Sequence, residues 1–208
     1  VGNSATNKLT MSGTTYKTGT GATDYEAKAG GTILLTDDDP TVTTGGGSLS
    51  FSTGDIVLST AGTTTFTTGA GGGDITIAGK IDGTATEAEA LAITSGTGNI
   101  AIQGAIGADA VLAGLSINAT DGDTGTIEVT DIGDDNAEGV NTGTVSIGNN
   151  ATVSLTLDGT VYKTDGATIY EAKSGDTILL TGADVLIQTK ADNLTFDLGN
   201  LVLSTDGT

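Results

Sequence analysis

The chain repeats itself at a spacing of about 145 residues, and this repetition constrains its fold more than any other feature. Residues 9–18 (LTMSGTTYKT) match residues 155–164 (LTLDGTVYKT), and residues 21–63 match residues 166–208. The two blocks share 31 identities in 53 aligned positions. We interpret residues 1–208 as one continuous segment, with a first copy of the unit at about 9–153 and a partial second copy at about 155–208. One and a half copies favour a longer parent protein or end-to-end stacking.

A shorter repeat lies inside this unit. It consists of a glycine, a variable residue that is often Asp or Asn, and then alternating apolar residues. Strict alternation places every second side chain on one face of a strand. The motif recurs at uneven intervals, and the glycines that begin it are Gly54, Gly73, Gly98, Gly125 and Gly143.

These short strands, separated by turns rather than helices, predict an all-β fold. Coils stacked about 4.8 Å apart pair each strand with its equivalent one turn away. We therefore predict a right-handed parallel β-solenoid (β-helix) with coils of about 18–27 residues, the range of the glycine intervals, and no helix longer than two turns. We expect residues 84–92 to form a bulging loop with at most one helical turn. Two β-sandwich domains divided near residue 145 are the alternative. The predicted core positions are Ile75, Ile77, Leu91, Ile93, Ile100, Ile102, Leu115, Ile117, Ile127 and Val129.

Composition narrows the partners. With 34 Gly and only 3% aromatic residues, the chain can fill a thin core but not a wide one. A net charge of −19, with scattered lysines and no arginine, argues against nucleic acid as a partner. No apolar run approaches the roughly 18 residues that span a bilayer, so we expect no membrane insertion. Without Cys or His, the chain lacks disulfides, thiolate zinc sites and imidazole bases.

Residues 71–119 carry the cadence GxIxIxGxIG followed by LxIxxGxGxI. This cadence, which covers roughly residues 49–159, resembles the repeat regions of filamentous-haemagglutinin-like exoproteins and autotransporter passenger domains. The resemblance implies a right-handed β-helical fibre that is exported through an outer-membrane pore and used in adhesion. It therefore implies an extracellular, cell-surface location. The Tyr-Glu-Ala-Lys blocks of this chain are not part of the resemblance.

Three acidic clusters lie in turn-like segments. Calcium prefers several oxygen ligands, which Asp-rich loops can supply, but none of the three matches an EF-hand loop or a calcium β-roll nonapeptide. Aspartate also favours turns through hydrogen bonds from its side chain to the backbone. Two interpretations stay open, solvated turns and calcium sites, and only Asp39 of its cluster persists in the second copy, as Asp184. The candidate ligands are Asp37, Asp38, Asp39, Asp121, Asp123, Asp134 and Asp135.

The block Tyr-Glu-Ala-Lys occurs twice, and all four tyrosines lie in or just before it. Tyrosine gives a large amphipathic contact area, so the blocks are a candidate interaction surface. On a strand, Glu26 and Lys28 would share one face and could pair. The alternative is that the blocks only cover a coil edge or a protruding hairpin. The candidate contact residues are Tyr16, Tyr25, Glu26, Lys28, Tyr162, Tyr170, Glu171 and Lys173.

Three functional classes follow, and the first is favoured. It is a structural or adhesive segment of a surface fibre, not an enzyme and without cofactors, whose partners are its own copies, end to end or laterally, or another cell's surface protein or glycan. The second is a calcium-stiffened surface-layer or sheath component. The third is a glycan hydrolase of the β-helix type, which needs two carboxylates about 5–10 Å apart. Such enzymes surround their carboxylates with Arg, His and aromatic side chains, and the composition here argues against that class.

Overall fold

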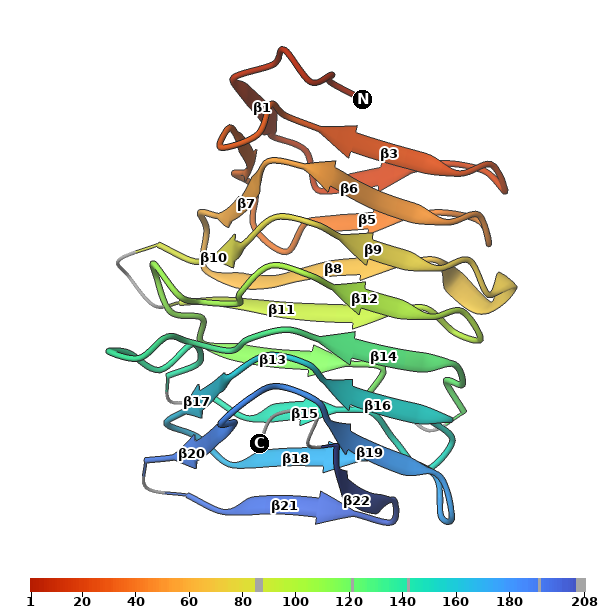
Figure 1. The fold of residues 1–208 in the computed structure, drawn as a ribbon. Coiled ribbons are helices and arrows are strands. Elements are labelled where there is room, and N and C mark those ends of the chain that lie inside the picture. The colour runs from red at the N-terminus through yellow and green to blue at the C-terminus, as the bar shows by residue number, and fades with distance from the viewer. Residues whose placement is uncertain (85–87, 121, 142, 191, 205–208) are drawn as a thin grey trace.

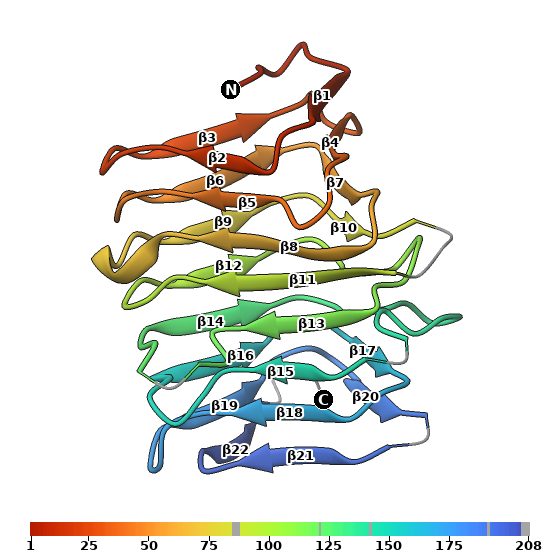
Figure 2. The same ribbon diagram turned by 180° about the vertical axis from the view of Figure 1, so that it is seen from behind.

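The chain forms a stack of parallel coils. The computed structural model describes residues 1–84, 88–120, 122–141, 143–190 and 192–204. Every strand pairing within these residues is parallel, and each pairing joins one coil to the next (Figures 1 and 2). The predicted all-β parallel solenoid is confirmed, and the sandwich alternative is wrong because sandwiches are built from antiparallel strands. The hand of the coil stays a prediction.

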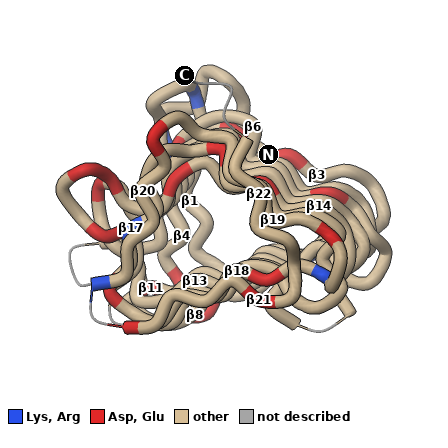
Figure 3. The backbone as a smooth tube through the Cα atoms, turned by 60° about the horizontal axis from the view of Figure 1, so that its bottom comes forward, with Lys and Arg blue, Asp and Glu red and all other residues tan. Residues whose placement is uncertain are grey.

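The coils have three faces, which give the stack a roughly three-sided outline (Figure 3). Two faces are continuous eight-stranded sheets, and the third is interrupted. Face A comprises β3 (Thr23–Glu26), β6 (Leu49–Thr53), β9 (Ile75–Ile77), β12 (Ile100–Ile102), β14 (Thr126–Val129), β16 (Ser154–Leu157), β19 (Thr177–Leu180) and β22 (Asn200–Leu203). Face C comprises β2 (Thr15–Lys17), β5 (Thr41–Thr43), β8 (Gly62–Thr67), β11 (Glu89–Thr94), β13 (Gly114–Ile117), β15 (Val145–Ile147), β18 (Thr168–Glu171) and β21 (Leu194–Asp197).

Face B is the interrupted face. It comprises β1 (Lys8–Met11), β4 (Thr32–Leu35), β7 (Asp55–Leu58), β10 (Ile81–Asp82), β17 (Val161–Thr164) and β20 (Leu186–Thr189). Between β10 and β17 this face has isolated bridges in place of strands, at Ile106 and Ile132, and further bridges at Leu112 and Val140 lead up to Thr164 of β17. The helix found in the described residues is one 3₁₀ turn, Gly69–Gly71, and no described helix has the length and apolarity to cross a bilayer.

The core is a set of aliphatic ladders inside the coils. Ile75, Ile100 and Ile127 lie in register on face A, so each isoleucine stacks on its equivalent one coil away. The side chains between them point outward, as two-residue alternation requires. All ten predicted core positions are buried, which confirms that prediction. The predicted loop at 84–92 is wrong for Glu89–Ala92, which belong to strand β11, while residues 85–87 lie outside the described residues.

Most coils have lengths in the upper part of the predicted range: Ile75 pairs with Ile100, and Ile100 pairs with Ile127. The amide of Ser95 donates to the side chain of Asn118, one coil on, at a separation of 23 positions along the chain. The side chain of Asn149 donates back to the carbonyl oxygen of Asn118 across 31 positions. The separation of 23 lies within the predicted range of 18–27 residues, and the separation of 31 exceeds its upper limit.

The short intervals of the glycine motif misled the prediction because they join different faces. Gly54 precedes β7 on face B and Gly73 precedes β9 on face A, so the interval between these two glycines is less than a full turn. Gly73, Gly98 and Gly125 all precede face A strands, so the intervals among these three are true coil lengths.

These face A glycines repeat because the coils touch through their backbones at the corner between faces C and A. A Cβ atom at Gly98 would lie 2.3 Å from the carbonyl oxygen of Gly73, and one at Gly125 would lie 2.2 Å from that of Gly98. Gly47 and Gly73 are crowded in the same way, each by the glycine one coil before it. Glycine is required here because no side chain fits between two coils this close.

The two copies of the 145-residue unit occupy different faces. The sequence Thr-Ile-Leu-Leu forms β4 on face B in the first copy and β19 on face A in the second, with the same alternation of burial. Seventeen strand positions separate β3 from β18, the fifteen steps between their labels plus the two bridge positions at Ile106 and Ile132. Three positions make one turn, so the repeat spans five and two-thirds turns. The repeat therefore falls one face short of six turns, and each second-copy strand lies on the face that precedes its first-copy face along the chain.

The crowding at the glycine corner predicts a contrast between two substitutions. Gly98→Ala should lower the free energy of unfolding by about 1–3 kcal/mol or more, because its methyl group meets the backbone of the preceding coil. Gly21→Ala, at the open end of the same glycine ladder, should be nearly neutral because a Cβ there meets no atom within 4 Å. Denaturant unfolding of both variants measures this, and equal losses would contradict the backbone contact.

Candidate functional site

The tyrosines of the two Tyr-Glu-Ala-Lys blocks lie in the core. Tyr25 on β3 and Tyr170 on β18 are buried, and each stacks on a phenylalanine of the next coil. The ring centroids of Tyr25 and Phe51 are 5.4 Å apart at 20°, and those of Tyr170 and Phe196 are 5.4 Å apart at 21°. This corrects the expectation of a tyrosine contact surface, since these rings are covered. The packing is copied between the blocks although they lie on different faces.

The two upstream tyrosines close local turns. The amide of Gly159 donates to the hydroxyl oxygen of Tyr162 at 2.8 Å, and the amide of Gly13 donates to that of Tyr16 at 2.5 Å. Tyr162 is buried and its hydroxyl also donates to the carbonyl oxygen of Val129 at 2.7 Å, whereas Tyr16 is half-buried in the first coil. Burial raises the pKa of Tyr162 above its ordinary value of 10. Tyr16 is thus the one predicted contact tyrosine whose ring is partly exposed.

The charged members of the blocks lie outside the core but do not form one patch. Glu26 lies on face A and accepts a hydrogen bond from the Ser52 hydroxyl at 3.4 Å, while Lys28 is exposed. The second block places Glu171 on face C, and the ammonium group of the exposed Lys173 lies 3.9 Å from Asp176. Because the copies are one face apart, the two blocks cannot present equivalent charges to one flat partner.

The candidate calcium ligands are spread over separate loops. The loop of Asp37–Asp39 joins β4 to β5, Asp123 lies between β13 and β14, and Asp134–Asp135 follow the bridge at Ile132. Asp121 lies outside the described residues. Among the described residues, no three acidic side chains gather closely enough to hold a metal ion. Asp134 accepts hydrogen bonds from the amides of Asn136 and Ala137 at 2.7 Å each, and these bonds lower its pKa.

Asp39 persists in the second copy for a structural reason. Its backbone has φ of 50°, and Asp184 has φ of 55°, a left-handed conformation that Asp and Asn tolerate better than most residues. The Asp39 carboxylate also accepts the amide of Thr63, one coil on, at 2.7 Å. Asp37 and Asp38 do not adopt the left-handed conformation, which fits their replacement by Gly182 and Ala183.

Sequence reasoning missed the main use of the acidic residues, which is to bind the next coil. The residue after the motif glycine accepts the amide of its equivalent one coil on: Asp74 accepts that of Asn99 at 2.8 Å, and Asn99 accepts that of Thr126 at 2.9 Å. Such side chains join coils at every corner. The same kind of bond to a residue of the next coil is made by Asp24, Asp39, Asp55, Asp82 and Asp131. The recurrence of Asp or Asn after glycine was the signal.

One carboxyl pair stands out. Glu128 lies on the outer side of face A, and burial raises its pKa, with further contributions from the charge of Asp158 and a hydrogen bond to it. One oxygen of Asp158 is buried without a hydrogen-bond partner among the described residues. Burial also raises the pKa of Asp82 and Asp123.

The outer side of face C carries a regular row of side chains that are small except for Ile169. Hydroxyl and methyl groups follow one another in register from coil to coil, and sequence alone could not align them. The positions are Thr15, Thr41, Thr65, Ala92, Ser116, Ser146, Ile169 and Thr195. A shallow hollow of about 190 Å³ lies along this row, and no acid–base pair lines it.

No protein-family model, no curated protein and no solved structure matches this chain. The parallel β-solenoid stands on the structure alone. The specific resemblance to filamentous-haemagglutinin-like repeats rests only on the sequence cadence of residues 71–119.

Two of the three buried tyrosines, Tyr162 and Tyr170, should respond differently to removal of the hydroxyl. Tyr162→Phe should cost about 1–3 kcal/mol, because the amide of Gly159 and the carbonyl of Val129 lose their partner. The Tyr170 hydroxyl is buried and has no hydrogen-bond partner among the described residues, so Tyr170→Phe should be neutral or stabilising by up to about 1 kcal/mol. Denaturant midpoints test this, and an equal cost for both variants would contradict it.

Proposed function

We propose that this chain is a structural or adhesive segment of an extracellular surface fibre and that it has no catalytic role. One observation carries the proposal: the coils pair without a break on two faces, around an apolar core that runs from the first coil to the last. Eight coils at about 4.8 Å give a core nearly 40 Å long. A repeat that is displaced by one face spreads its surface groups around a rod, which suits a spacer.

The surface chemistry supports the same role. Most acidic residues lie along the corners (Figure 3), and the outer side of face C carries mostly small side chains. A net charge of −19 keeps a long rod soluble and apart from other polyanions. Under this proposal the partners are copies of the same protein, or a surface protein or glycan of another cell. The cadence resembling filamentous-haemagglutinin-like repeats supports the cell-surface location.

Calcium and catalysis are the two alternatives that experiment must separate from this proposal. Calcium would stiffen the rod only by binding the folded state better than the unfolded one. Among the candidate calcium ligands, Asp38 has an exposed carboxylate. For hydrolysis, the Glu128–Asp158 pair is the nearest approach to paired carboxylates, and it lies on an outer face.

The proposal predicts that melting is the same, within about 2 °C, in millimolar calcium and in chelator. It also predicts that no reducing ends are released from a panel of polysaccharides. The double variant Asp37→Asn, Asp38→Asn and the single variant Glu128→Gln are the matched controls. A calcium-dependent rise in melting temperature that the double variant abolishes would establish the calcium alternative. Sugar release that Glu128→Gln abolishes would overturn the proposal.

A further inference from the structure

The outer side of face C is uncharged over five neighbouring strands. We define the uncharged strip as the outer side of β5, β8, β11, β13 and β15, all of which the structure describes (Figure 2). The outward residues of these strands are threonine, alanine, glycine or serine. The whole chain carries a net charge of −19, so a strip of this length is unusual on its surface.

The outer sides of the other two faces carry charges within their strands. Glu128 lies in the middle of face A, and Asp24 and Glu26 lie on β3 of the same face. Face B carries Asp55 on β7 and Lys163 on β17. Two copies that met through face A would bring carboxylates of like charge together, which costs free energy. Face C is therefore the face on which a second copy meets the least repulsion.

The chemistry of the uncharged strip suits contact with an identical strip. A hydroxyl group both donates and accepts hydrogen bonds, so a surface of threonine and serine is complementary to itself. Small side chains also allow two sheets to pack face to face at about 10 Å. Ile169 lies on the outer side of β18, next to the strip, and is 39% exposed. A second copy lying on face C would cover this apolar side chain.

Opposite charges lie at the two ends of face C. Lys17 is on β2 and Asp197 is on β21, the two outermost strands of this sheet, and both residues are exposed. Each lies two positions after a member of the outward row, Thr15 or Thr195, so the two charges share one column. A two-fold rotation about an axis parallel to the strands reverses the stack and keeps this column. Lys17 of each copy then lies opposite Asp197 of the other.

We propose that face C binds face C of a second copy, so that two rods lie side by side in opposite directions. In this isologous pair β2 lies opposite β21 and β11 lies opposite β13, and the contact between Lys17 and Asp197 is made twice. The inference deepens the proposed fibre role by naming the surface for lateral association, and it rests on that role only for its biological use. Its failure would leave the calcium and polysaccharide tests unaffected, so the two failures can be told apart.

The area of face C sets the strength of the pair. Eight strands at about 4.8 Å and about five residues at about 3.3 Å cover roughly 600 Å² on each copy, or about 1,200 Å² in total. This is the lower limit for a specific interface, so the dimer should be weak and should depend on protein concentration.

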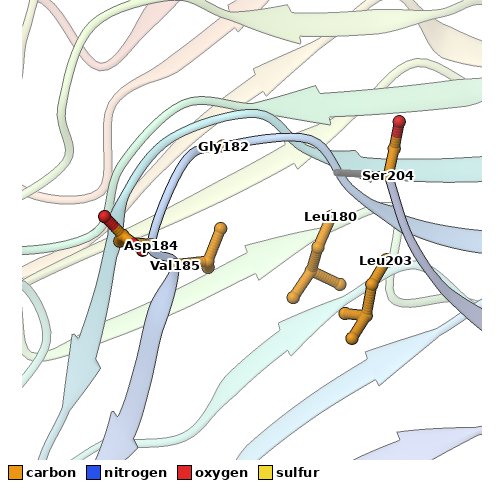
Figure 4. A pocket seen from close by; sticks show the side chains of 6 residues that line it. All are labelled: Leu180, Gly182, Asp184, Val185, Leu203 and Ser204. Carbon is orange, nitrogen blue, oxygen red and sulfur yellow. The ribbon is translucent and has the colours of Figure 1, made fainter. Parts of the chain in front are cut away.

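A different surface can also join two copies, end to end. A hollow of about 200 Å³ lies between Leu180, Val185 and Leu203 (Figure 4). The two leucines belong to β19 and β22 of face A, and Val185 precedes β20 of face B, so the hollow is not part of face C. Leu203→Asp places a charge at this hollow, on a side chain that is 67% exposed, and leaves face C unchanged.

The experiment is sedimentation of the 208-residue chain at physiological salt, from about 1 µM to about 1 mM. We expect a monomer–dimer equilibrium. The double variant Ala92→Glu, Ser116→Glu places four carboxylates at the centre of the pair and should weaken dimerisation at least about ten-fold. The matched control is Thr76→Glu, Ala101→Glu, the same charge change at paired outward positions on face A. This control and Leu203→Asp should leave the dimer nearly unchanged, and melting curves check that all variants fold.

Exchange of the two end charges tests the orientation of the pair. Lys17→Asp alone and Asp197→Lys alone should each weaken dimerisation about three-fold or more, because each variant places like charges opposite one another. The variant with both changes should recover the original dimerisation, since the pair then forms again with its signs exchanged.

Four outcomes would overturn the proposal. The chain stays monomeric over the whole concentration range, or the two double glutamate variants weaken the dimer equally. Leu203→Asp abolishes the dimer while Ala92→Glu, Ser116→Glu leaves it intact, which would show that the copies meet end to end. The exchange of Lys17 and Asp197 fails to recover what the single changes lose.

Discussion

The structure depends on one interaction, the in-register pairing of each strand with the strand one coil away. It satisfies the backbone polar groups and stacks each side chain on its equivalent, as Tyr25 stacks on Phe51. The same close spacing explains the corners. It leaves no room for a Cβ atom at Gly98, and it brings the Asp74 carboxylate within 2.8 Å of the Asn99 amide. The glycines and aspartates at the corners therefore contribute to the stacking of the coils, independently of any partner.

This pairing requires only that inward and outward side chains alternate along each strand. It does not depend on which face the strand occupies, so the two copies can differ by one face. The Thr-Ile-Leu-Leu strand keeps its pattern of burial on face B and on face A. The bond between the Thr18 and Thr23 hydroxyls, 2.7 Å, recurs between Thr164 and Thr168, 2.6 Å, at a different corner. The same sequence therefore forms the same local structure in both copies. The face on which that structure lies depends on the number of strands that precede it. Any surface group of the repeat is then distributed around the axis.

The sequence predicted what alternation and repetition encode: parallel strands, the aliphatic core and the near absence of helix. It could not predict the faces, because all three use the same two-residue period, and this error set the lower limit of the predicted coil length too low. It offered the buried Tyr25, Tyr162 and Tyr170 as candidate contact residues because tyrosine gives a large amphipathic contact area. Only the structure shows Tyr170 on Phe196. The Asp and Asn residues after glycine were noticed as a pattern, but their acceptor role needed the register between coils.

Disulfide cross-linking measures the central claim directly, and the chain has no cysteine of its own. Ile169 lies in register with Ser146 on face C, although its first-copy equivalent, Asp24, lies on face A. Adjacent parallel strands bring such paired positions within the Cα separation that a disulfide spans, about 4.4–6.8 Å. The account predicts an intramolecular disulfide when cysteines replace Ser146 and Ile169, and none when they replace Thr156 of face A and Ile169. A disulfide between positions 156 and 169, and none between 146 and 169, would show that the second copy keeps its face and would contradict the account.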